Sequence, residues 1–174
     1  MKNQKLITRC LIISLSVLIT VGSALTLYFL ANPDTKRDDV IKAELDRYDS
    51  LGVSTAKVNF EATGINPADT VKHTVELTGE VEGEADLTLS FNEDKNHDNK
   101  LAQYLYVTVN INGTEYCNMK LSELFGKTLD TLECVIDEKE PVIIEVSYHM
   151  PSETGNEAAY TEAFFDLLIT ATNE

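Results

Sequence analysis

Apolar and polar residues alternate along five segments of this chain, and this pattern limits its fold more than any other feature. The alternation runs through Val71–Leu77, Ala85–Phe91, Leu105–Ile111, Val142–Tyr148 and Ala163–Ala171. Because successive side chains of a strand point to opposite faces of a sheet, a period of two predicts strands with one buried face. The sequence therefore predicts a domain built from β-sheets.

Weaker strand candidates and turn signals complete this pattern. The candidates are Ile41–Leu45, Val53–Phe60, Thr114–Asn118 and Thr131–Ile136, and turn-forming residues gather at 66–69, 92–100 and 151–157. Asn112-Gly113 is the strongest hairpin signal, because both central positions of a type I′ turn need positive φ. Only Leu121–Phe125, closed by Gly126, is typical of a helix. Many short strands predict an all-β fold, an antiparallel two-sheet sandwich.

An uncharged, apolar run of 22 residues from Cys10 to Ala31 follows Lys2, Lys5 and Arg9. It is longer than the apolar part of a signal peptide, about 7–15 residues, and close to a full membrane span of about 20 residues, and both interpretations stay open. Basic residues stay on the cytoplasmic side, so either interpretation exports the rest of the chain. Residues 1–31 are therefore predicted to form a hydrophobic helix that is a signal peptide or an N-terminal transmembrane anchor.

Cleavage of this leader needs small residues at the first and third positions before the cut. Gly22-Ser23-Ala24 meets this requirement, so Ala24 is a processing candidate and a signal peptidase is the predicted partner during export. Cleavage there would leave the apolar segment Leu25–Leu30 at the new N-terminus. The alternative is an uncleaved anchor that binds the membrane through residues 10–31.

The exported part is strongly acidic. The formal net charge is −15, and the leader holds three positive and no negative side chains, so the remainder carries −18. This charge argues against nucleic acid as a partner, and solubility outside the cell is its simplest explanation. Residues 32–39 are predicted to be a polar spacer, and residues 40–174 match one extracellular β-sandwich domain.

Two cysteines lie in the exported part, Cys117 and Cys134. An extracytoplasmic location permits a disulfide, so this pair is a disulfide candidate. The alternative is two buried thiols, since a free cysteine often behaves as a small apolar residue.

The densest polar cluster spans 92–100, where Asp94, Asn96 and Asp98 have the alternate spacing of a calcium loop. Asn99 stands where an EF-hand needs glycine and Leu105 where it needs glutamate, so the segment is not an EF-hand. The three residues are predicted to form either a solvated loop or a weak calcium site. No other cofactor is predicted.

No enzyme motif is present in the sequence. His73, His97 and His149 belong to no HExxH or similar zinc grouping, and there is no G-x-S-x-G turn or glycine-rich phosphate loop. His73 and His149 are expected to be solvent-facing sheet residues. The tyrosines and phenylalanines of the predicted strands are expected to make core or cross-strand contacts. The alternative is that they form a carbohydrate- or peptide-binding surface.

Several short motifs resemble the TasA/camelysin family of exported proteins of Gram-positive bacteria, whose leaders are processed by a SipW-type signal peptidase. Thr26-Leu27-Tyr28-Phe29 resembles the end of that family's leader, and Ile65–Val71 resembles its L-x-P-G-D-x-V turn into a strand. The C-terminal part resembles the family's Y-x-M-P, G-N-E and F-x-A-T-Q order in Tyr148–Pro151, Gly155–Glu157 and Phe165–Thr172.

Four positions depart from the family pattern. Leu27 replaces the small residue before the cut, which puts processing at that candidate site in doubt; Ala68 replaces the turn glycine, Ala158-Ala159-Tyr160 a frequent Y-Q-G, and Asn173 the final glutamine. The resemblance implies a jelly-roll-like sandwich and a role at the cell surface or in the extracellular matrix, where family members form biofilm fibres.

Three functions follow from these observations. The first is a non-enzymatic matrix or fibre subunit that self-assembles by strand addition, motivated by the apolar segment Leu25–Leu30. The second is a membrane-anchored, monomeric binding or accessory domain. The third is a camelysin-like metallopeptidase, for which the sequence offers no zinc-ligand spacing.

The first residue of the mature protein separates the first two functions. We expect mass spectrometry of envelope and medium fractions to find a chain that starts at Leu25, Tyr28 or a neighbouring residue. A chain that keeps Met1 or Lys2 and occurs only in membranes would contradict this expectation and support the anchored domain.

Overall fold

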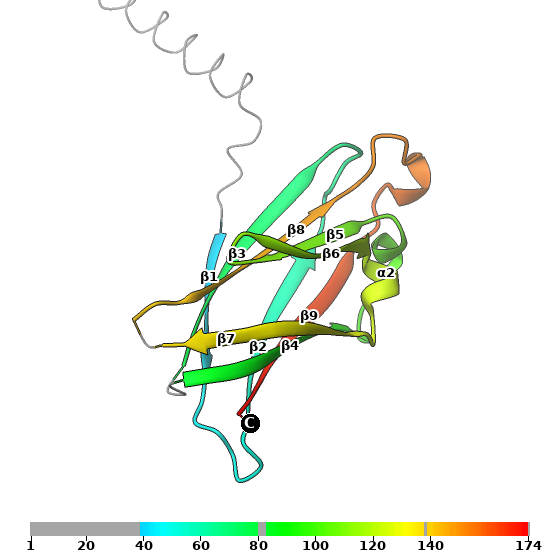
Figure 1. Cartoon of the computed structure of the whole chain (residues 1–174). Coiled ribbons are helices and arrows are strands. Elements are labelled where there is room, and N and C mark those ends of the chain that lie inside the picture. Colours follow the sequence, from blue (N-terminus) through cyan, green and yellow to red (C-terminus); the bar gives the residue numbers. More distant parts are fainter. Residues whose placement is uncertain (1–38, 80–82, 138, 174) are drawn as a thin grey trace, which may run out of the picture. The chain divides into compact units, whose positions relative to one another are not determined.

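In the computed structural model, residues 39–79, 83–137 and 139–173 are described. These residues form nine strands (Figure 1): β1 (Asp39–Leu45), β2 (Val53–Ala62), β3 (Thr70–Gly79), β4 (Gly83–Glu93), β5 (Tyr106–Ile111), β6 (Thr114–Lys120), β7 (Thr128–Ile136), β8 (Val142–His149) and β9 (Ala163–Thr172). Their helices are single turns: η1 (Lys100–Gln103), α2 (Leu121–Leu124) and η2 (Asn156–Ala158). All nine strands expected from the sequence are confirmed.

The strands form two sheets. The five-stranded sheet has the order β1-β3-β8-β5-β6, and the four-stranded sheet has the order β2-β9-β4-β7. Apart from the β5–β6 hairpin, consecutive strands belong to different sheets, as they do in jelly rolls. The β-rich, two-sheet architecture is confirmed.

One pairing corrects the expectation of a wholly antiparallel sandwich. Strand β1 is parallel to β3, with Asp39 opposite His73 and Leu45 opposite Gly79, whereas the other described pairs are antiparallel. After β1 the chain returns through β2 in the other sheet and then enters β3 in its original direction. Two strands joined by such a crossover lie parallel.

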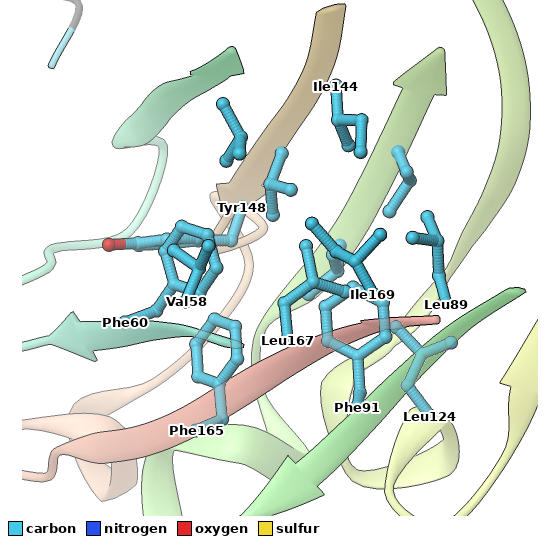
Figure 2. Packing of buried hydrophobic residues seen from close by; sticks show 14 of the residues in the cluster. Val58, Phe60, Leu89, Phe91, Leu124, Ile144, Tyr148, Phe165, Leu167 and Ile169 are labelled. Carbon is cyan, nitrogen blue, oxygen red and sulfur yellow. The ribbon is translucent and has the colours of Figure 1, made fainter. Parts of the chain in front are cut away.

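An apolar layer holds the two sheets together. Buried and half-buried residues alternate along the whole of β8 and β9. At its centre Phe165 stacks on Phe60 with 5.2 Å between ring centroids, and Tyr148 meets Phe165 edge-on at 6.0 Å (Figure 2). Aromatic residues bury about 150–250 Å² each, and each Å² of apolar surface removed from water contributes about 25 cal/mol. This layer is therefore the main source of stability.

Four connections meet at one end of the sandwich, which we call the loop end. They join β2 to β3, β4 to β5, β6 to β7 and β8 to β9 (Figure 1). Backbone hydrogen bonds link them to their neighbours: Leu101 N–H donates to the Glu162 carbonyl, and Gly126 N–H donates to the Phe91 carbonyl. The loop end is therefore a connected surface built from distant parts of the sequence.

The backbone forms turns at both predicted positions, 112–113 and 66–69. Asn112 and Gly113 have φ values of 47° and 81°, as the predicted type I′ hairpin between β5 and β6 requires. At residues 66–69, Asp69 N–H donates to the Asn66 carbonyl over 2.9 Å, and Ala68 has a φ of 71°. Proline at the second position and positive φ at the third define a type II turn, which favours glycine where this chain has Ala68.

Replacement of Ala68 by glycine should stabilise the domain. An L-residue with left-handed backbone costs about 1–2 kcal/mol, and glycine costs about 0.5–1 kcal/mol more entropy on folding. We therefore expect Ala68→Gly to raise the free energy of unfolding by up to about 1 kcal/mol in urea denaturation. Ala62→Gly, in the extended backbone of β2, is the control and should destabilise; equal effects of the two substitutions would contradict this account of the turn.

Candidate functional site

Part of the predicted machinery lies outside the described residues. This applies to the leader 1–31 with the processing candidates Ala24 and Leu27, and to all of the spacer 32–39 except Asp39, which begins β1. No helix among the described residues is long and apolar enough to cross a membrane.

The calcium candidates lie in the β4–β5 connection, and their side chains have partners within the protein. Asp94 Oδ1 accepts from the backbone N–H and the side-chain amide of Asn96, at 2.9 and 2.8 Å. Asp98 forms an ion pair of 2.7 Å with Lys100. The Asn96 backbone hydrogen bond is the largest of the effects that hold the pKa of Asp94 below its usual value. A cation here would compete with these contacts, and calcium binding stays a prediction.

The Asn99 side chain binds this loop to strand β9. Its Oδ1 accepts from the Phe164 backbone N–H at 2.6 Å, and its Nδ2 donates to the Asp94 carbonyl at 2.7 Å. The ring of His97 also stacks on Phe164 with 3.9 Å between centroids. These contacts bind the polar loop to β9, so its density of Asp and Asn residues has a structural role.

The two cysteines lie on edge strands of different sheets, Cys117 on β6 and Cys134 on β7. Cys117 is buried and Cys134 half-buried, and both are free thiols in the structure. A disulfide between them stays a prediction. Burial is the largest cause of the raised pKa of each thiol.

The orientation of His73 differs from the one that the sequence predicts. It was expected to face solvent, but it packs inward, with 5.2 Å between its ring centroid and that of Phe60. Its Nε2 lies 2.9 Å from the Tyr148 hydroxyl, which donates to the Glu61 carbonyl over 3.2 Å (the hydroxyl is red in Figure 2). His73 has the same parity as the core residue Val75, and this signal predicts its orientation better than its polar neighbours do. His149 is half-buried on the outer face and stacks on Tyr106.

The His73 environment favours the neutral imidazole. Burial lowers the pKa of His73, and the nearby carboxylate of Asp39 only partly opposes this effect. Because Tyr148 donates to Glu61, Nε2–H of His73 donates to the tyrosine oxygen, which leaves Nδ1 as a buried nitrogen without a hydrogen-bond partner. Burial also raises the pKa of Tyr148 to about 12. The His73 imidazole and the Tyr148 hydroxyl could take part in proton transfer. In the described part of the chain, no group of three His, Cys, Asp or Glu residues could hold a metal ion.

The edge strands of the two sheets are a further candidate site, and they differ in the regularity of their pairing with the neighbouring strand. In β6, Asn110 faces Glu115 while Val109 faces Cys117, which leaves Tyr116 as an extra residue. In β7, residues 131 and 132 lie opposite Leu87 alone. Such bulges interrupt the hydrogen-bonding ladder and protect an edge from further pairing. Strands β1 and β2 keep continuous register with their partners over 7 and 10 residues.

Edge strand β1 is also incompletely covered by the four-stranded sheet. Its inward-facing residues range from exposed Asp39 through half-buried Ile41 to Ala43 and Leu45, which are 6% and 0% exposed. Val71, which faces inward near the start of β3, is half-buried as well. Side chains of the core face are therefore partly accessible near edge strand β1, which contacts edge strand β2 of the other sheet.

Comparisons with known proteins do not assign a family. No family model and no curated protein matches the chain. Among solved structures, FlhE is 8% identical with a TM-score of 0.44 over 70% of this chain and 99% of FlhE. Aeromonas hydrophila PliG, a periplasmic inhibitor of g-type lysozyme, is 9% identical with a TM-score of 0.33 over 76% of this chain and 99% of PliG. A β-glucosidase from Paenibacillus barengoltzii is 12% identical with a TM-score of 0.29, over 77% of this chain but only 11% of that enzyme. Similarities this low carry no functional assignment.

The buried imidazole should make stability depend on pH. Below a pH of about 6.5 the unfolded chain binds a proton at His73 that the folded domain resists, so stability should fall as the pH drops from 6.5 towards the lowered folded-state pKa. We expect urea denaturation between pH 7.5 and 5 to show a smaller fall for His73→Phe than for wild type. One proton accounts for at most a tenfold change in the unfolding constant per pH unit.

The matched control is His149→Phe, which makes the same replacement on the outer face. Parallel pH curves for wild type and His73→Phe would show that the imidazole is not held neutral by the fold.

Proposed function

We propose that this protein is an exported structural subunit of the cell surface or extracellular matrix, similar to the TasA/camelysin family, which assembles into fibres by strand addition. The observation that carries the proposal is the partly covered inward face of β1 beside the regular, open edge of β2. The acidic, exported domain and its apolar N-terminal segment support the same function.

The acceptor in this proposal is the β2 edge. A strand added there would extend the four-stranded sheet to five strands and lie opposite β1. Its inward side chains would then cover Ile41 and Val71, which are half-buried in the single chain. Backbone hydrogen bonds along an edge give affinity in this mode of binding, and alternate side chains give specificity.

The donor is the segment Leu25–Leu30 of another copy, exposed after cleavage at Ala24. In an extended conformation Leu25, Leu27 and Phe29 share one face, which suits an apolar layer. Donor and acceptor are different surfaces of the chain, so the contact is heterologous. Heterologous contacts that do not close into a ring generate open filaments, which is the assembly expected of a matrix protein.

The two alternative functions require different properties of the protein. A membrane-anchored accessory domain needs an uncleaved leader and remains monomeric. A metallopeptidase needs a bound metal, and elemental analysis of the native protein that finds stoichiometric zinc would favour it over the structural subunit.

Assembly should depend on the donor segment and on the inward face of β1. We expect a chain that starts at Leu25 to polymerise, as measured by sedimentation and electron microscopy, and a chain that starts at Asn32 to remain monomeric. In the longer chain, Ile41→Lys should reduce the assembled fraction at least tenfold, because a charge there would be buried beneath the donor strand.

Val40→Lys is the matched control, because Val40 is the neighbouring residue on the outer face and is 53% exposed. Circular dichroism melts of both variants separate loss of assembly from loss of folding. Polymerisation of the chain that starts at Asn32, or equal assembly of the two lysine variants, would contradict strand addition at this edge.

A further inference from the structure

A pocket of 340 Å³ lies at the loop end, between the β2–β3 connection and the β8–β9 connection. Its lining comes from residues 64–67 of the first connection and from residues between 150 and 161 of the second, with Asn156 and Tyr160 among them. Its volume is within the range of small-ligand sites, which are mostly apolar and contain a few placed polar groups. The sheet edges used for assembly contribute no residue to its lining.

The walls of the pocket are held in place by the turn and by backbone hydrogen bonds. Ala68 N–H donates to the Met150 carbonyl over 2.8 Å, and Met150 N–H donates to the Asp69 carbonyl over 3.1 Å. Asp69 Oδ2 also accepts from the backbone and the side chain of Asn66, at 3.0 and 3.1 Å. Three short sequence motifs, at 65–71, 148–151 and 155–157, therefore meet around one preformed cavity.

Tyr160 lines this pocket and combines full exposure with an unusual backbone conformation. Its side chain is fully exposed, at 106% of the reference value, and its φ is 63°, a left-handed conformation that glycine or asparagine adopts with less strain. The preceding turn fixes this geometry, because Thr161 Oγ1 and N–H both donate to the Ala158 carbonyl, at 2.6 and 3.2 Å. The backbone thus presents an aromatic ring to solvent at a position that does not favour one.

The residues that line the pocket are uncharged, although the chain contains 29 Asp and Glu residues. Its polar groups are the amides of Asn66 and Asn156, the hydroxyls of Tyr160 and Thr161, and backbone atoms. Asn156 is exposed, and its amide has no hydrogen-bond partner among the described residues. Two carboxylates border the lining, since Asp69 Oδ2 accepts from Asn66 and the Glu157 carboxylate lies against Gly155, so an anionic polymer would be repelled here.

We propose that this pocket binds a neutral polysaccharide chain, with Tyr160 as its stacking platform. The C–H face of a sugar ring packs on an aromatic ring, and the sugar hydroxyls both donate and accept hydrogen bonds. Tyrosine supplies a rigid, amphipathic contact surface of this kind. Asn156 supplies both a donor and an acceptor within the same lining. This activity does not rest on strand addition, since the two surfaces are separate.

The experiment is isothermal titration of the purified mature protein with cellohexaose, laminarihexaose and chitohexaose, supported by native gels cast with the corresponding polymers. We expect saturable binding of at least one of these neutral glycans. Tyr160→Asn should lower the affinity at least tenfold while the melting temperature stays equal or rises, because asparagine tolerates the positive φ. Tyr160→Phe should keep most of the affinity, since it keeps the ring.

Two controls make the result decisive. Leu51→Ala removes another exposed apolar side chain, 82% exposed and outside the pocket, and should bind like wild type. Alginate, an anionic polysaccharide, should not bind. The proposal is overturned if no neutral glycan binds at millimolar concentration, if Tyr160→Asn binds like wild type, or if that variant loses only self-assembly, which would identify the pocket as a contact between copies.

Discussion

The apolar layer between the two sheets is the constraint on which the rest of the molecule depends. Phe60, Phe165 and Tyr148 pack against one another at its centre, and each comes from a different strand. Because the rings must interdigitate, the sheets are held face to face, and the connections at the loop end are placed by the strands that enter this layer. The layer also brings His73 beside the Tyr148 hydroxyl. A polar pair at the margin of an apolar core is therefore a consequence of how the sheets pack.

The packing of the core does not explain two features of the domain. These are the unequal number of strands in the two sheets and the positive φ values of two residues at the loop end. Five strands over four leave the start of β1 partly covered, and the bulges of β6 and β7 make the opposite edges irregular. At the loop end, Ala68 and Tyr160 adopt positive φ values beside the same pocket. Strain of this kind is commonly found where a backbone must present particular groups. The proposed assembly edge and the proposed glycan pocket thus lie in separate parts of one domain.

Particular residues show how far the sequence could predict the site. The Asn112-Gly113 hairpin and a turn at residues 66–69 could be predicted from turn-forming residues. The positive φ of Ala68 is visible only in the structure, because alanine does not signal it. The 92–100 loop was harder to interpret, since Asp94, Asn96 and Asp98 have the spacing of cation ligands. In the fold, Asn96 and Lys100 already contact these carboxylates, and Asn99 binds the loop to β9. Residue type and spacing indicate which groups are available, but they do not show which partners the fold supplies.

The sequence by itself determined the nine strands, the buried face of most of them and the acidic character of residues 32–174, because these properties depend on local periodicity and composition. Only the tertiary structure decided which strands are neighbours, that β1 runs parallel to β3, that His73 meets Tyr148, and that residues 64–67 and 150–161 enclose a pocket with an uncharged lining. The physical reason is that strand pairing and pocket walls are contacts between segments far apart in the chain. A period of two reports that one face is buried, and it carries no information about the partner against which that face packs.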